Sequence, residues 1–137
     1  MSNEEQIQAL IEEAGNAFSA LDFDRWLNCF HSPRTVILPG SVFSSGSYDE
    51  SKAALMPVFE RVQQKGFKRT QLDLCNIRIL SDTTAIASTV WTRFGSDEQV
   101  LERLGATYML LHADGQWKIA VLTAHGADVI VVTESIP

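Results

Sequence analysis

The sequence predicts an α+β fold, in which N-terminal helices cover one face of a curved antiparallel sheet. Through the N-terminal half, apolar residues recur at helical steps. From Thr70 onward the period falls to two residues, and β-branched and aromatic residues form runs separated by turn residues. The chain has 137 residues, of which 45% are apolar and 20% are charged, so we expect a single domain over residues 1–137.

The first predicted element is an amphipathic helix at the N-terminus. Its apolar face is formed by residues at three- and four-residue steps, namely Ile7, Leu10, Ile11, Ala14, Ala17, Phe18 and Leu21. Ser2 and Glu5 have the spacing of a capping box, in which each side chain accepts a backbone N–H from the other residue. We therefore expect the helix to begin directly after Ser2.

A short second helix is expected next. Asp22 can cap it, and Trp26, Leu27 and Phe30 then lie on one side. Proline disfavours helical conformation in the preceding residue, so the helix should end near Pro33. A short strand is predicted over 35–38, and Pro39 with the following glycine ends it.

The polar run 44–47 predicts a loop that leads into a third helix. Ser47 or Asp49 can cap this helix, which should extend to about Gln64 and end at Gly66. Pro57 lies within it and lacks a backbone donor, so we expect a kink there or a later start.

The rest of the chain reads as long strands. They are predicted at about 70–80, 83–94, 100–112 and 117–132. The connections between them are short, which makes neighbouring strands antiparallel. Strands of this length must coil, and the helices can cover only the inner face of the sheet. The outer face therefore needs water or another partner.

Two local segments carry a resemblance to a known family. Residues 22–30 followed by 35–40 look like a helix, an aromatic stop, a strand and a Pro-Gly turn, and residues 107–111 with 114–119 look like a final hairpin. Together with the order of elements, they resemble the nuclear transport factor two-like superfamily, which includes ketosteroid isomerase and the SnoaL-like cyclases. The resemblance implies a cone-shaped fold with an apolar pocket between the helices and the inner sheet face.

The resemblance also implies pocket and interface residues. The expected pocket lining is Ala14, Phe18, Trp26, Phe30, Leu38, Ser88, Val90, Thr107, Met109, Leu122 and Ala124. Such a lining suits a small hydrophobic molecule, although the same residues also fit an ordinary closed core. Members of the superfamily commonly form a homodimer through the outer face of the sheet, where we expect Trp91 and Tyr108.

The ketosteroid isomerase mechanism is excluded by the residues at its key positions. That mechanism uses a carboxylate base before the Pro-Gly turn, a tyrosine on the first helix and a protonated carboxylic acid on the penultimate strand. The corresponding residues here are Leu38, Ala14 and, at about the third position, Thr107. Leucine and alanine have no proton to transfer, and a threonine hydroxyl is a poor acid.

Two other enzymatic sites of the superfamily are matched only in part by the residues of this sequence. An epoxide hydrolase-like site would need Arg93, Asp97 and Glu98, which we interpret as solvated charges at a strand end and turn. A scytalone dehydratase-like site would draw on His31, His112, His125, Tyr48 and Tyr108. His125 is the weak catalytic candidate, because its imidazole could exchange protons near neutral pH. Strict alternation, however, points Leu122 and Ala124 inward and leaves His125 on the outer face.

Three functions therefore stay open at this point. The first is binding of a small hydrophobic molecule in the pocket. The second is a cofactor-free lyase, isomerase, dehydratase or cyclase that uses His125 or a tyrosine. The third is a module for dimerisation or protein association.

Composition and missing motifs set further expectations. A formal net charge of −6 opposes nucleic-acid binding, and no run approaches the roughly 18 apolar residues of a membrane span, so we expect a cytoplasmic protein. Neither paired metal-ligand motifs nor nucleotide-binding or nucleophile-elbow motifs occur in the sequence, so we expect no metal and no cofactor. Cys29 and Cys75 lie in apolar stretches and should be buried thiols.

Overall fold

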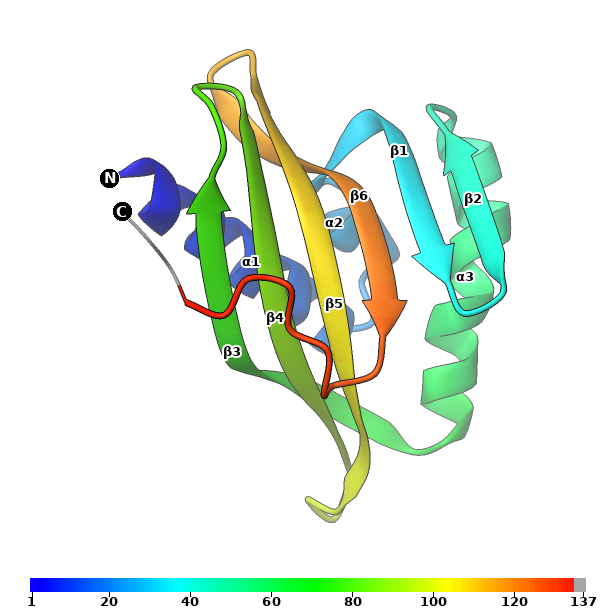
Figure 1. The fold of residues 1–137 in the computed structure, drawn as a ribbon. Helices are drawn as coiled ribbons and strands as arrows, with labels where there is room; N and C mark the ends of the chain where they lie inside the picture. The colour runs from blue at the N-terminus through cyan, green and yellow to red at the C-terminus, as the bar shows by residue number, and fades with distance from the viewer. Residues whose placement is uncertain (135–137) are drawn as a thin grey trace.

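The computed structural model describes residues 1–134, so the last three residues of the predicted domain 1–137 lie outside the described residues. Its helices are α1 (Asn3–Ser19), α2 (Phe23–Leu27) and α3 (Tyr48–Gln64). Its strands are β1 (Phe30–Leu38), β2 (Ser41–Ser45), β3 (Phe67–Ile79), β4 (Thr84–Gly95), β5 (Val100–Ala113) and β6 (Gln116–His125). Figure 1 shows the strands as one curved sheet with the helices behind it, which confirms the predicted α+β class.

The sheet has the strand order β2-β1-β6-β5-β4-β3. β3, β4, β5 and β6 form the predicted antiparallel meander, whereas β1 pairs with β6 in parallel. The chain between β1 and β6 includes α3 and the other strands, so this parallel pairing joins two segments that are far apart in the sequence, and the sheet stays open at β2 and β3. We call the helix-covered face concave and the opposite face convex.

The helix starts follow the predicted caps. The Ser2 hydroxyl accepts from the Glu5 backbone N–H at 3.2 Å, and the Ser2 N–H donates to the Glu5 carboxylate at 3.1 Å, which completes the capping box. The Asp22 carboxylate caps α2. Ser47, not Asp49, caps α3, and Gly66 follows this helix with a φ of +79°, a conformation that glycine adopts without strain.

Two short segments differ from prediction. β1 begins at Phe30 and passes through Pro33, where the sequence predicted the end of a helix. The β1–β6 register breaks between Phe30 and Thr35, so the missing N–H of proline falls where regular pairing is interrupted. The polar run predicted as a loop lies partly in β2, because strand pairing uses backbone groups and tolerates Ser44 and its neighbours on an edge.

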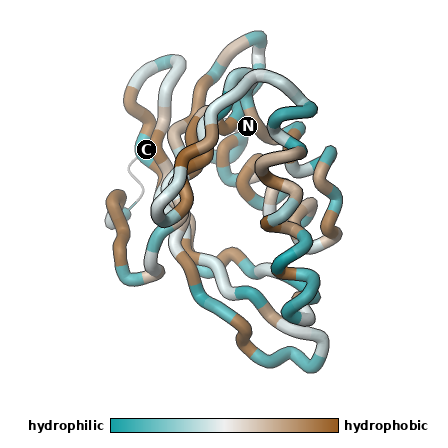
Figure 2. Tube along the Cα trace, turned by 90° about the vertical axis from the view of Figure 1, so that its right-hand side faces the viewer, coloured by the Kyte–Doolittle hydropathy of each residue, from teal (hydrophilic) through white to brown (hydrophobic). Residues whose placement is uncertain are grey.

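The last strand is shorter than predicted, and this changes the convex face. β6 ends at His125, and residues 126–134 cross back over the sheet, on the side opposite the helices (Figures 1 and 2). The Ser88 hydroxyl of β4 accepts the N–H groups of Val131 and Val132 at 3.1 and 2.8 Å. Asn76 of β3 donates to the Val132 carbonyl at 3.0 Å. The chain itself therefore covers part of the face that the sequence left bare.

Aromatic rings join α3 to the other helices. Phe59 of α3 is the centre of this cluster, with ring centroids 4.7 Å from Phe18, 5.5 Å from Phe23 and 5.2 Å from Trp26. Such tilted and edge-on arrangements are favourable beyond their buried area. The cluster fixes α1, α2 and α3 relative to one another on the concave side. None of these three helices in the described chain combines the length and apolarity needed to cross a membrane.

Candidate functional site

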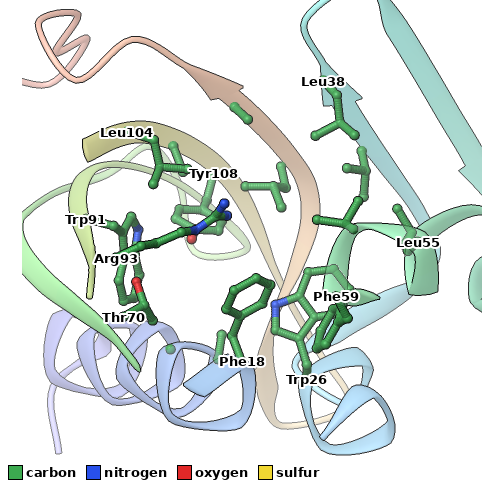
Figure 3. A pocket seen from close by; sticks show the side chains of 17 residues that line it. Phe18, Trp26, Leu38, Leu55, Phe59, Thr70, Trp91, Arg93, Leu104 and Tyr108 are labelled. Atoms are coloured by element: carbon green, nitrogen blue, oxygen red, sulfur yellow. The ribbon is translucent and has the colours of Figure 1, made fainter. Parts of the chain in front are cut away.

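A cavity of about 110 Å³ lies between the helices and the concave face of the sheet, and it is partly open to solvent. Figure 3 shows its side chains, which come from α1, α2, α3 and strands β1, β3, β4, β5 and β6. The lining is Ala14, Gly15, Phe18, Trp26, Val36, Leu38, Leu55, Val58, Phe59, Thr70, Trp91, Arg93, Leu104, Ala106, Tyr108, Leu122 and Ala124. Apart from a few polar groups, this wall is apolar.

The structure brings part of the predicted pocket together. Six of the predicted residues line the cavity: Ala14, Phe18, Trp26, Leu38, Leu122 and Ala124. Phe30 is buried with its ring centroid 4.5 Å from that of Trp26, so it packs behind the wall. The contribution of α3, with Leu55, Val58 and Phe59, was missed at the sequence level. The apolar spacing of these residues along α3 is the signal that could have found it.

The faces predicted for β4 and β5 are wrong. Ser88, Val90, Thr107 and Met109, which were expected inside, lie on the convex face; Trp91 and Tyr108, which were expected outside, line the cavity. A one-residue error in phase reverses every side chain of a strand. In β4, residues 87–92 are all buried, since the C-terminal segment covers the outer side. The alternation of polar and apolar residues therefore did not show which side chains of β4 face the cavity.

Trp91 is held rigidly against α1. A Cβ atom at Gly15 would lie 2.5 Å from the Trp91 ring, so the indole packs directly on the glycine backbone. The Trp91 indole N–H donates to the Thr89 hydroxyl at 2.8 Å, and that hydroxyl donates to the Ala106 carbonyl at 2.8 Å. The indole is thus a fixed wall of the cavity with its polar group already bonded.

Tyr108 supplies a hydroxyl that stays protonated. Burial raises the pKa of Tyr108 well above its ordinary value of 10.0, although Thr89 and Trp91 favour the phenolate. At neutral pH the group is a neutral phenol. It can donate a hydrogen bond, but it offers no basic site.

Arg93 brings a positive charge to the cavity wall. Its side chain is 17% exposed, and its Nη1 donates to the Glu102 carboxylate at 3.0 Å. The guanidinium carbon lies 5.0 Å from the Phe18 ring centroid, within cation–π range. Burial lowers the pKa of Arg93 and Glu102 opposes that shift, but an arginine keeps its charge in either case.

His125 lies on the convex face, in agreement with strict alternation along β6. Its Nδ1 lies 2.9 Å from the Gly126 carbonyl, so Nδ1 carries the proton and donates. Its Nε2 lies 2.7 Å from the Thr107 hydroxyl, which donates to it when the ring is neutral. A Cβ atom at Gly105 would lie 2.6 Å from the ring, so the imidazole also packs tightly on β5. Both nitrogens are bonded on the face opposite the cavity.

The other candidates for a dehydratase-like site are dispersed. His31 Nδ1 bonds to the Pro33 carbonyl at 3.0 Å, and the His112 ring lies 5.0 Å from that of Trp117. Tyr48 is 44% exposed at the start of α3. Within the described chain, Tyr108 is the one member of that predicted set that lines the cavity.

The epoxide hydrolase-like set is also separated. Arg93 lines the cavity, whereas Asp97 and Glu98 lie in the exposed turn between β4 and β5. Glu98 forms an ion pair with Arg69 at 2.7 Å. Its carboxylate thus belongs to the surface, as the sequence indicated.

The thiols are free and poorly ionised. Cys29 is buried and Cys75 is half-buried. Burial raises the pKa of Cys29 to about 11 and that of Cys75 to about 12. Over residues 1–134, no group of three or more His, Cys, Asp and Glu side chains is placed to hold a metal ion.

A second, shallower depression of about 390 Å³ lies between α1, α2 and the start of β6. An ion pair borders it, with Arg25 Nε 2.6 Å from the Glu13 carboxylate. Lys118 there donates to the Asn28 carbonyl at 2.5 Å. These polar groups already bond to their neighbours, so the apolar cavity on the concave side is the stronger candidate site.

Comparison with solved structures gives the same fold. An NTF2-like protein of unknown function from Shewanella oneidensis MR-1 is 17% identical with a TM-score of 0.73, over 90% of this chain and 98% of that one. An NTF2-like protein with a cystatin-like fold from Novosphingobium aromaticivorans is 13% identical with a TM-score of 0.75, over 94% and 84%. A protein of unknown function with a cystatin-like fold from Nostoc punctiforme is 12% identical with a TM-score of 0.75, over 94% of each chain.

These identities are low and establish the fold alone. No curated protein matches the sequence. The family model described as NTF2-like protein (DUF6841) matches residues 3–127, which confirms the resemblance carried by the two local segments. The chain therefore belongs to the NTF2-like family DUF6841.

Proposed function

We propose that the concave cavity binds a small, mainly apolar organic molecule. The observation that carries this proposal is a partly open space of about 110 Å³ with an apolar wall and a few polar groups. Ligand sites in proteins have this composition. The volume is below the roughly 300–1,000 Å³ of sites for drug-sized molecules, so the expected ligand is a single ring or a short chain.

The titratable groups favour binding over catalysis. Among the described residues, neither a carboxylate nor an imidazole lines the cavity, and Tyr108 is held protonated. General-base catalysis needs a proton acceptor within hydrogen-bonding reach of the substrate. A cofactor-free lyase, isomerase or cyclase would have to use Tyr108 as an acid, since His125 bonds to Thr107 on the other face.

A cavity-filling variant tests the proposal. Ala124→Leu adds three carbons to the cavity wall, whereas Thr123→Leu places a similar side chain on the convex face. We expect benzyl alcohol to bind the wild-type protein and Thr123→Leu, and to bind Ala124→Leu at least about tenfold more weakly, as measured by NMR titration. Equal binding to both variants, or no binding to the wild-type protein, would contradict the proposal.

The convex face supports self-association as a second function. Ile86, Met109 and Val121 lie side by side on β4, β5 and β6, and each stays partly exposed beside the C-terminal segment. A row of apolar side chains across a sheet is typical of protein contacts. We propose a homodimer through this row, and not through Trp91 or Tyr108, which line the cavity.

Sedimentation velocity measures this association directly. We expect Met109→Glu to convert a wild-type dimer to monomer, because it places a charge in the contact. Leu80→Glu is the matched control, since Leu80 is 54% exposed just beyond the end of β3. A monomeric wild-type protein, or a dimer that Met109→Glu leaves intact, would refute this second function.

A further inference from the structure

The cavity contains one charge that the apolar lining does not explain. Arg93 reaches from β4 into the cavity beside Phe18, and Trp26 and Phe59 lie further along the wall (Figure 3). Among the lining residues that the structure describes, it is the one charged side chain. Moving a cation away from water is costly unless it is paired. Arg93 therefore has a structural partner, a ligand, or both.

Its structural partner satisfies only part of the guanidinium. Nη1 of Arg93 donates to Glu102, which stands directly opposite on β5 and is itself 46% exposed. A guanidinium has five N–H donors. No nitrogen of Arg93 is fully buried without a hydrogen-bonding partner, so its remaining donors are reached from the cavity or from solvent. A molecule in the cavity can accept hydrogen bonds from them.

The geometry favours a carboxylate as that acceptor. A carboxylate matches a guanidinium in shape and charge and can accept two parallel N–H bonds. The low exposure of Arg93 strengthens such a pair, because water screens it less than at the surface. The whole cavity measures about 110 Å³ and has aromatic rings in its wall, so the molecule can contain about one six-membered ring.

We propose that the cavity selects a compact aromatic carboxylate, whose carboxylate binds Arg93 and whose ring packs near Phe18, Trp26 and Phe59. This inference rests on the proposed binding function of the same cavity and adds the chemical class of its ligand. Glu102 competes with the ligand for Arg93, because both carboxylates accept from the same guanidinium. Removal of the Glu102 charge should therefore strengthen binding of an acid.

Calorimetric titration with sodium benzoate and with neutral benzyl alcohol tests the inference. We expect benzoate to bind the wild-type protein and to bind Arg93→Gln at least about tenfold more weakly, since the charge-assisted pair is lost. Benzyl alcohol carries no charge, so Arg93→Gln should weaken its binding much less than it weakens the binding of benzoate. Glu102→Gln should bind benzoate several-fold more tightly than the wild-type protein and leave benzyl alcohol unchanged. If the Arg93–Glu102 pair had a purely structural role, Glu102→Gln would not increase the affinity for benzoate.

The outcomes separate this inference from the function on which it rests. The carboxylate selectivity is overturned if benzyl alcohol binds and benzoate does not, or if neither substitution changes the affinity for benzoate. The cavity would then be a site for neutral molecules. Binding of neither compound overturns both. If Arg93→Gln unfolds, as seen by circular dichroism, Glu102→Gln decides alone: tighter benzoate binding supports the proposal, and unchanged or weaker binding refutes it.

Discussion

Gly15→Ala is a stringent test of how α1 meets the sheet. Glycine inside a helix usually costs about 1 kcal/mol relative to alanine, so the substitution would stabilise an unconstrained helix by that amount. Here the added methyl group would lie 2.5 and 2.7 Å from two atoms of the Trp91 ring. Overpacking of this kind costs about 1–3 kcal/mol. We therefore expect a net loss of about 1 kcal/mol in the free energy of unfolding.

A second substitution, at Trp91, reverses the expected effect of Gly15→Ala on the free energy of unfolding. Trp91→Phe removes the outer ring atoms that the methyl group would meet, at the cost of a cavity. In that background, Gly15→Ala should stabilise the protein by about 1 kcal/mol, because only the helix propensity remains. Urea unfolding followed by far-ultraviolet circular dichroism measures all four proteins without relying on the fluorescence of the altered tryptophan.

The interaction energy between Gly15→Ala and Trp91→Phe shows whether the two residues are in contact. Residues in direct contact show interaction energies of about 0.5–3 kcal/mol in a double-mutant cycle. If Gly15→Ala stabilises the wild-type protein as much as it stabilises Trp91→Phe, then the Trp91 indole does not pack on Gly15. The assignment of Trp91 to the concave face would then be wrong.

Three further predictions concern the thiols and the C-terminal segment. Cys29 and Cys75 should resist iodoacetamide in the native protein at pH 8 and react in urea, as measured by mass spectrometry, because burial raises both pKa values. Since the native thiols hold their protons above the ordinary pKa of 9.0, the free energy of unfolding should fall as the pH rises beyond that value, and flat stability there would contradict their burial. Ser88→Ala leaves the N–H groups of Val131 and Val132 without their acceptor, so it should cost about 1–3 kcal/mol and speed amide hydrogen exchange at those residues. Unchanged exchange would show that the segment is held by other contacts.

The parts of the fold set by local chemistry were predictable from the sequence. The capping box at Ser2 and Glu5, the cap at Asp22 and the helix stop at Gly66 each depend on residues close in the chain. The change to a period of two after Thr70 identified the meander for the same reason. These signals need no knowledge of which distant segments pack together.

The site required tertiary information. β4 is buried on both faces because residues 126–134 cover the side opposite the helices. Ser88 and Thr89 are therefore equally buried, and the pattern of polar residues could not show which side chains face the cavity. The C-terminal segment itself was read as a continuation of the last strand, since 129–132 is an apolar run with high strand propensity. That one long-range contact explains both the misplaced strand end and the reversed face.

The register of β4 also determines which of its side chains face the cavity, and so whether a positive charge is available to bind a carboxylate. Trp91 and Arg93 are two residues apart and share the concave face, whereas Thr92 between them donates to Asp73 on the other side. A bulge directly after Arg93 interrupts the pairing with β5, which is how strands often redirect a side chain near a site. A one-residue slip would exchange Arg93 for Thr92 at the cavity and remove its positive charge. The sign reversal expected for Gly15→Ala therefore tests, by stability alone and without any ligand, the register on which binding of a carboxylate depends.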